Sequence, residues 1–269
     1  MAIKISNAFI TKLQMVSDTK FNTIEDFTGT AAIISGSTIS VGGGGGLSAV
    51  LWYDASDTNS YPGTGTTIYN IGSDGNASGT TGTLSGVSFD GTTASGILDF
   101  DGGSDRIVFP SYDFGNQITV TAWVYPRSEA SINTLLSNAS AGLNTNGFKL
   151  EWNNWNTSDL KMLIEAGNGS SGNIYTADSA TIVLDEWQMI SYVIDFSNQT
   201  ATLYRNGSSV AASGTIVSGI NTSATWNIGS MMGSYFMNAK LGELKVFKSN
   251  LSSSDISAEF DNTKSRYGL

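Results

Sequence analysis

The chain has 269 residues, of which 40% are hydrophobic and 13% are charged, so it can bury one large core but carries few surface charges. Its net charge of -10 opposes binding to nucleic acid or anionic lipid, because both need a positive surface. It contains no cysteine and no histidine, which excludes disulfides, the usual zinc sites and catalysis by Cys or His.

A run of five glycines, Gly42 to Gly46, divides the chain. The two apolar stretches before it, 3–16 and 31–41, are too small to close a core. Residues 1–46 therefore form either a flexible tail or a segment that folds against another chain. We expect the second, an N-terminal docking arm that ends in a glycine linker and precedes one domain over 47–269.

The N-terminus lacks the continuous apolar region of a signal peptide. The chain also has no run of about 18 apolar residues, the length that a membrane span requires. These two features predict synthesis in a host cytoplasm and no membrane insertion.

From residue 47 onward the pattern predicts β-strands. In 117–126 the residues Ile118, Val120 and Val124 alternate with Thr119 and Thr121 at a period of two. Further strands are expected over 147–152, 160–165, 187–196, 200–205, 225–228 and 241–247. Many short strands separated by Gly, Asn and Ser predict an all-β fold, a two-sheet antiparallel jelly-roll sandwich.

Two local signals supplement the strand pattern. Asn206-Gly207 predicts a type I′ turn, because both residues tolerate a positive φ. Ser252 and Asp255 have the spacing of a capping box, which predicts a helix of about three turns that begins there and ends before Gly268. We expect Ile256 on this helix to face the sheet.

Five segments of the chain resemble laminin-G-like, concanavalin A-like jelly-roll domains of bacteriophage virion proteins. They are 51–76, beginning Leu-Trp-Tyr-Asp-Ala, 98–108 with its Phe-Asp-Gly turn, 118–126, 187–207, and 242–252 with its Gly-Glu-Leu-Lys-Val-Phe strand. They occur in the expected order across 47–269. Residues 1–46 lie outside the resemblance.

The resemblance implies a non-catalytic structural protein on the outer surface of a phage capsid or tail. The arm would bind other virion proteins, and the sandwich would form a homo-oligomer with weak adhesion to host surface glycans. Two alternatives remain open, a receptor-binding lectin of a tail fibre and a glycan depolymerase. A fold of this kind serves many functions, so the residues of a site must decide.

Domains that resemble this one often carry calcium near the rim of the sandwich. The acidic candidates for such a site are Asp99, Asp101, Asp105 and Glu243. Calcium takes about six to eight oxygen ligands, which carboxylates and loop carbonyls can supply. The alternative interpretation is that these residues are solvated loop positions in an acidic protein.

A glycan site needs exposed aromatic rings beside amide groups. The segment Trp152-Asn153-Asn154-Trp155 has this composition, and Tyr235 is a further loop aromatic. The candidates for glycan contacts are Trp152, Asn154, Trp155 and Tyr235. For the two tryptophans we favour packing, against a neighbouring subunit or the edge of the sheet. Trp123, Trp187 and Trp226 lie in predicted strands and are expected in the core.

Glycoside hydrolysis needs two carboxylates that flank the scissile bond. Glycosidases of the concanavalin A-like class resemble one another in a Glu-x-Asp-x-x-Glu strand, and this chain contains no Glu-x-Asp. We therefore expect that the protein is not an enzyme.

Overall fold

The computed structural model describes residues 23–25, 31–35, 38–40, 48–75, 80–128 and 131–269. The chain divides into two units, residues 1–46 and 47–269. In the first unit, β1 (Thr23–Glu25), β2 (Ala31–Ser35) and β3 (Thr38–Ser40) form an antiparallel sheet. The glycine run and most of the predicted docking arm lie outside the described residues.

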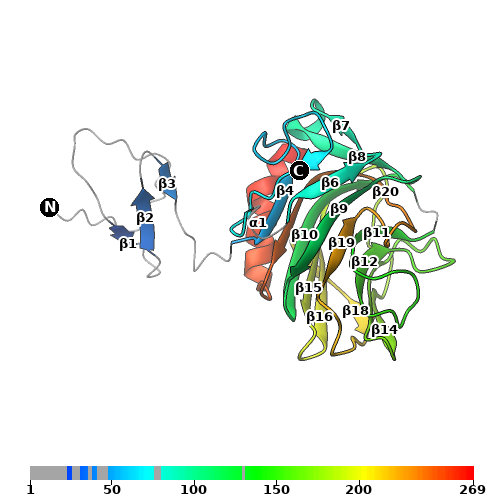
Figure 1. The fold of residues 1–269 in the computed structure, drawn as a ribbon. Helices are drawn as coiled ribbons and strands as arrows, with labels where there is room; N and C mark the ends of the chain where they lie inside the picture. The colour runs from blue at the N-terminus through cyan, green and yellow to red at the C-terminus, as the bar shows by residue number, and fades with distance from the viewer. Residues whose placement is uncertain (1–22, 26–30, 36–37, 41–47, 76–79, 129–130) are drawn as a thin grey trace, which may run out of the picture. The chain divides into compact units, whose positions relative to one another are not determined.

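The second unit is a sandwich of two antiparallel sheets (Figure 1). The first sheet has the order β17-β16-β15-β10-β20-β8-β7, and β4 also pairs with β20. Its strands are β4 (Leu51–Asp54), β7 (Ser88–Asp90), β8 (Ile97–Asp101), β10 (Gln117–Pro126), β15 (Gln188–Asp195), β16 (Thr200–Arg205), β17 (Ser208–Val210) and β20 (Asn238–Phe247).

The second sheet has the order β18-β14-β13-β12-β11-β19-β9-β6-β5. Its strands are β5 (Thr67–Ile68), β6 (Gly82–Ser85), β9 (Arg106–Asp113), β11 (Asn133–Ser137), β12 (Gly147–Trp152), β13 (Met162–Gly167), β14 (Gly172–Ala177), β18 (Ala212–Gly214) and β19 (Ser223–Ile228). The predicted all-β sandwich is thus confirmed.

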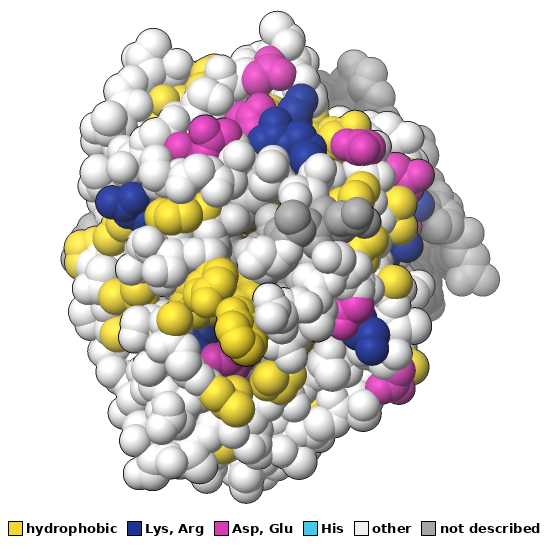
Figure 2. Space-filling view, turned by 90° about the vertical axis from the view of Figure 1, so that its right-hand side faces the viewer, with side chains coloured by type: hydrophobic (Ala, Val, Ile, Leu, Met, Phe, Trp, Pro, Cys, Tyr) yellow, Lys and Arg dark blue, Asp and Glu magenta, His cyan; other side chains and the backbone are white. Residues whose placement is uncertain are grey.

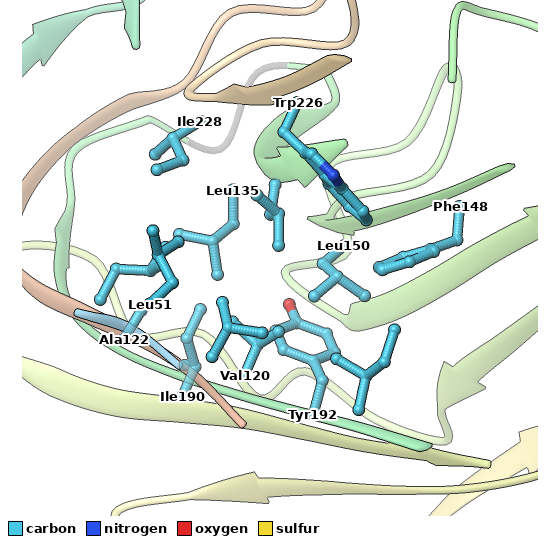
Figure 3. Packing of buried hydrophobic residues seen from close by; sticks show 14 of the residues in the cluster. Leu51, Val120, Ala122, Leu135, Phe148, Leu150, Ile190, Tyr192, Trp226 and Ile228 are labelled. Carbon is cyan, nitrogen blue, oxygen red and sulfur yellow. The ribbon is translucent and has the colours of Figure 1, made fainter. Parts of the chain in front are cut away.

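The core lies between the two sheets. Val120 and Ala122 of β10 face it from the first sheet, and Phe148 and Leu150 of β12 face it from the second, with Trp226 of β19 beside them (Figure 3). Trp123 points to the opposite side of β10 and is buried in a second apolar cluster. Strand β10 therefore carries buried apolar side chains on both of its faces.

The C-terminal helix covers the outer side of the first sheet. Helix α1 (Ser253–Thr263) begins with the predicted capping box of Ser252 and Asp255, and Ile256 is fully buried. The 3-10 helix η3 (Lys264–Tyr267) follows and ends at Gly268, which has a φ of 81°. Figure 1 shows α1 on the side of the sandwich away from β11, β12 and β14.

The last strand of the sandwich is central in its sheet. β20 pairs with β10 along one edge and with β8 and β4 along the other, so strands from both ends of this unit meet there. Among the described residues, no helix combines the length and the apolar character of a membrane span.

Candidate functional site

The outer face of β12 and β13 carries buried charges. Side chains alternate along β12, so Phe148, Leu150 and Trp152 enter the core while Lys149 and Glu151 point outward. Lys149 pairs in register with Glu165 of β13. All three charged residues are nevertheless buried. Since a bare outer face would be open to solvent, the loops above these strands must cover them.

Lys149 holds one of these loops. Its ammonium donates a hydrogen bond to the carbonyl oxygen of Gly142 at 2.7 Å and forms an ion pair with Oε1 of Glu165. The Lys149 side chain has no exposed surface. Removal of one partner of such a buried pair typically costs about 3 to 5 kcal/mol, because the other charge is left uncompensated.

Glu151 is buried without a partner. Neither oxygen of its carboxyl group has a hydrogen-bond partner within the described structure. Burial raises the pKa of the Glu151 carboxyl well above 4.5, the nearby Glu165 raises this pKa further, and Lys149 lowers it. Burial without a hydrogen-bond partner therefore favours the protonated form of Glu151 over its carboxylate.

A hollow of about 380 Å³ opens above this layer. Its lining residues are Ile132, Ala141, Gly142, Leu143, Asn154, Trp155, Glu165, Ile174, Met231 and Tyr235. Figure 2 shows a face of the molecule on which hydrophobic side chains gather into a patch. Large apolar side chains are exposed at its rim, since Trp155 is 67% exposed and Leu143 41%.

A fixed turn presents Trp155. Asn153 and Asn156 on either side of it both have a φ of 62°, a left-handed conformation that asparagine tolerates better than most residues. The buried Asn153 side chain donates to the carbonyl oxygen of Ser131 at 2.9 Å and accepts from the amide of Leu160 at 2.7 Å. Asn154 accepts from the backbone amide of Trp155 at 2.7 Å. The exposed indole therefore projects from an ordered loop.

Left-handed backbone also occurs across the hollow. Met232 has a φ of 49° and Tyr235 a φ of 50°. Non-glycine residues in this conformation store strain, and they concentrate at binding sites where the surrounding structure holds them. Backbone strain and exposed apolar side chains thus coincide on this face of the sandwich.

Three of the four predicted glycan residues come together. Asn154, Trp155 and Tyr235 line the same hollow, although Tyr235 is 80 residues from Trp155 in the sequence. The glycan role considered for Trp152 is ruled out, because this residue is fully buried and has no ring face for a sugar, in agreement with the packing interpretation. Sequence reasoning also missed Glu165 and Leu143, since the pairing of the strands and the path of the loops place them here.

The predicted calcium residues do not form one cluster. Asp99 makes a two-pronged ion pair with Arg127, at 2.5 and 3.1 Å. Asp105 accepts from the backbone amide of Asp101 at 2.9 Å. Glu243 lies opposite Asp54 and accepts from the indole nitrogen of Trp52 at 3.2 Å.

The strand register also separates two of the calcium candidates. Asp99 of β8 lies opposite Lys240 of β20, whereas Glu243 of β20 lies opposite Asp54 of β4, so the two acids belong to different strand pairings. Within the described ranges, no three His, Cys, Asp or Glu residues are grouped as metal ligands.

A second hollow of about 390 Å³ lies at residues 113–117, with Lys248 beside it. Its aromatic lining residue, Phe114, is fully buried. The Lys248 ammonium lies 4.4 Å from the centre of the Tyr112 ring, so a protein partner already occupies it. The hollow at Trp155 is therefore the stronger candidate site.

Comparisons with known proteins agree with the fold. A family model described as the concanavalin A-like lectin/glucanases superfamily matches residues 101–257. No curated protein sequence matches the chain.

Three of the similar solved structures have TM-scores of 0.57 to 0.58. The receptor-binding domain of botulinum neurotoxin type G is 14% identical, over 80% of this chain and 51% of that one. Domain 4 of a GH43 extracellular arabinanase from Geobacillus stearothermophilus, in complex with arabinotriose, is 16% identical over 79% and 98%. A Trypanosoma rangeli sialidase in complex with sialic acid is 14% identical over 81% and 33%.

At these identities the likeness establishes the fold alone. The chain spans about half the length of the toxin domain that it matches, and about a third of the sialidase.

Proposed function

Because the chain belongs to the concanavalin A-like lectin/glucanase superfamily, we propose that its sandwich binds carbohydrate through the hollow around Trp155 and does not cleave it. One observation carries the proposal: an indole that is 67% exposed stands on an ordered turn at the rim of a hollow. An indole in this position offers one face to a sugar ring, and a fixed turn lowers the entropy cost of binding.

The polar groups of the hollow suit sugar hydroxyls. Asn154 uses its carbonyl oxygen within the loop, which leaves its side-chain NH2 group to donate. Glu165 uses Oε1 for Lys149, and its Oε2 has no hydrogen-bond partner among the described residues, so it can accept. An aromatic face beside one donor and one acceptor matches a small sugar subsite. The structure of the arabinanase domain with arabinotriose supports such a role for this fold.

Binding without cleavage is supported by the acidic groups. Glycoside hydrolysis needs two carboxylates that both reach the substrate, typically about 5 to 9 Å apart. Glu165 is the one acidic residue that lines the hollow among those the structure describes, and its neighbour Glu151 has no exposed surface. A reducing-end assay with any oligosaccharide that binds should detect no release of product, and measurable release would contradict this part of the proposal.

The binding experiment compares two exposed aromatic residues. In a glycan array and by calorimetry, Trp155→Ala should abolish binding, whereas Tyr69→Ala should preserve it, because Tyr69 is 40% exposed and does not line the hollow. Retained binding in Trp155→Ala, with equal melting temperatures, would reject the site.

For the setting we propose the outer surface of a bacteriophage particle. In this proposal residues 1–46 bind another virion protein, and the sandwich is displayed in many copies as a homo-oligomer. Many copies can convert weak single-site affinity into firm adhesion to host glycans. The resemblance over 47–269 supports this proposal.

Deletion of residues 1–46 tests the proposed attachment. The shortened protein should stay soluble and still bind glycans, but it should be missing from purified particles. Normal incorporation would contradict the role of the arm, and the glycan proposal would stand independently. A tail-fibre lectin remains the alternative, and cell adhesion by the isolated sandwich would favour it.

A further inference from the structure

We infer that the hollow around Trp155 selects uncharged sugars and rejects sugars that carry a carboxylate or a sulfate group. This inference rests on the proposed carbohydrate binding and specifies its ligand class. It follows from the positions of two charges at the hollow: a ligand can reach Glu165 but cannot reach Lys149.

The charge that a ligand can reach is negative. Glu165 lines the hollow, and the other lining residues are uncharged. Its Oε2 has no hydrogen-bond partner in the described part of the chain, while Oε1 takes the ion pair with Lys149. A free carboxylate oxygen accepts hydrogen bonds from hydroxyl groups and donates none. An anionic sugar would bring a second negative group against it.

The matching positive charge cannot be reached. Lys149 has no exposed surface, and its ammonium is bound to Gly142 and Glu165 beneath the floor of the hollow. An acidic sugar therefore finds no cation to replace the water that it loses on entry. Burial of a charge without a partner is costly, and a like charge nearby raises the cost.

The rest of the surroundings favour the same selection. The rim residues Asn154, Trp155 and Tyr235 include no Lys, Arg, Asp or Glu. Lys149 and Glu165 form an ion pair, so no unpaired positive charge faces the hollow from this pair. The net charge of -10 adds a repulsion that acts at a distance and weakens with salt.

The test uses the full chain and matched pairs of oligosaccharides. An array carries each neutral glycan beside its sialylated, sulfated or uronic acid counterpart. Calorimetry then measures the affinity of both members of each pair in which binding is detected on the array. The neutral member should bind at least tenfold more tightly. Weaker binding of the acidic member that persists at high salt arises from its contact with Glu165 in the hollow, because salt screens the long-range repulsion.

Glu165→Gln tests the residue held responsible. Glutamine can still accept from Lys149, but the cation beneath the floor is then uncompensated. The neutral-to-acidic affinity ratio should fall by at least fivefold relative to the wild type. Lys149→Met with Glu165→Gln removes both charges and keeps the side-chain volumes similar. This double variant should also show a lower ratio, and it replaces the single variant if that one does not fold.

The outcomes are distinct. Equal binding of neutral and acidic members to the wild type would overturn the inference and leave the proposed function intact. An unchanged ratio in both folded variants would overturn the role of Glu165. Binding of no glycan at all, in the wild type as in Trp155→Ala, would defeat the proposed function and this inference with it.

Discussion

Trp152 and Trp155 are three residues apart, yet the first has no exposed surface and the second is 67% exposed. Trp152 is the last residue of β12 and points into the core with Phe148 and Leu150. Between the two tryptophans, Asn153 turns the chain through a left-handed conformation. One short segment therefore supplies both a core residue and an exposed ring.

The two tryptophans should respond in opposite ways to substitution. Trp152→Ala should lower the free energy of unfolding by about 3 to 5 kcal/mol, because truncation of a buried tryptophan leaves a cavity. Trp155→Ala should change it by less than about 0.5 kcal/mol, as expected at an exposed position. Urea denaturation of the two variants beside the wild type measures both values. Equal costs would contradict this assignment of core and surface.

Glu151 should make the protein less stable as pH rises. Its folded pKa is raised, so the folded state keeps a proton that the unfolded state loses near pH 4.5. The contribution of Glu151 to stability is therefore fully present below that pH and is lost as pH rises through the folded pKa. Glu151→Gln removes this titration and should flatten the decline.

The pH experiment compares melting temperatures of the wild type and Glu151→Gln from pH 4 to pH 9. Glu151→Met is the matched variant without polar atoms, and it tests whether amide burial itself has a cost. A decline of the same slope in all three proteins would assign the effect to another group.

The ring of Tyr267 should contribute to the stability of the fold, and its hydroxyl should not. The ring stacks on Trp123 with a centroid distance of 4.2 Å, while the hydroxyl is buried without a hydrogen-bond partner in the described structure. Tyr267→Phe should leave the melting temperature equal or raise it, because an unsatisfied buried group is removed. Tyr267→Ala should cost about 3 to 5 kcal/mol. A clear loss in Tyr267→Phe would indicate a partner for the hydroxyl.

Calcium should not change stability. A site filled at a hundredfold excess over Kd would add about 2.7 kcal/mol. Asp99 and Glu243 bond to separate partners, Arg127 and Trp52, so we expect the same melting temperature with millimolar calcium and with chelator. A shift that chelator reverses would demonstrate a site that these contacts do not predict.

The sequence predicts a strand well where the strand itself is long enough to show an alternating pattern. β10 and β12 have the predicted bounds, because alternation over six or more residues marks both ends. The Asn206-Gly207 turn is also confirmed, with φ values of 49° and 78°. Short strands such as β5, with two residues, carry no pattern of their own and are defined by their neighbours.

The site was predicted less completely, for two reasons. The period of two along β12 already places Trp152 on the same face as Phe148 and Leu150, so its burial could have been predicted. In contrast, the pairing of Lys149 with Glu165 depends on the register between two strands, which turn lengths and core packing decide together. Sequence spacing alone does not contain that information.

The central position of β20 has a consequence for synthesis of the protein. The ribosome makes residues 238–247 after every other strand, yet they lie between β10 and β8 and also pair with β4. A nascent chain that lacks them leaves the facing edges of β10, β8 and β4 unpaired, and such edges promote aggregation. The first sheet therefore closes only after residues 238–247 have left the ribosome, and chains released before that point should appear as insoluble protein.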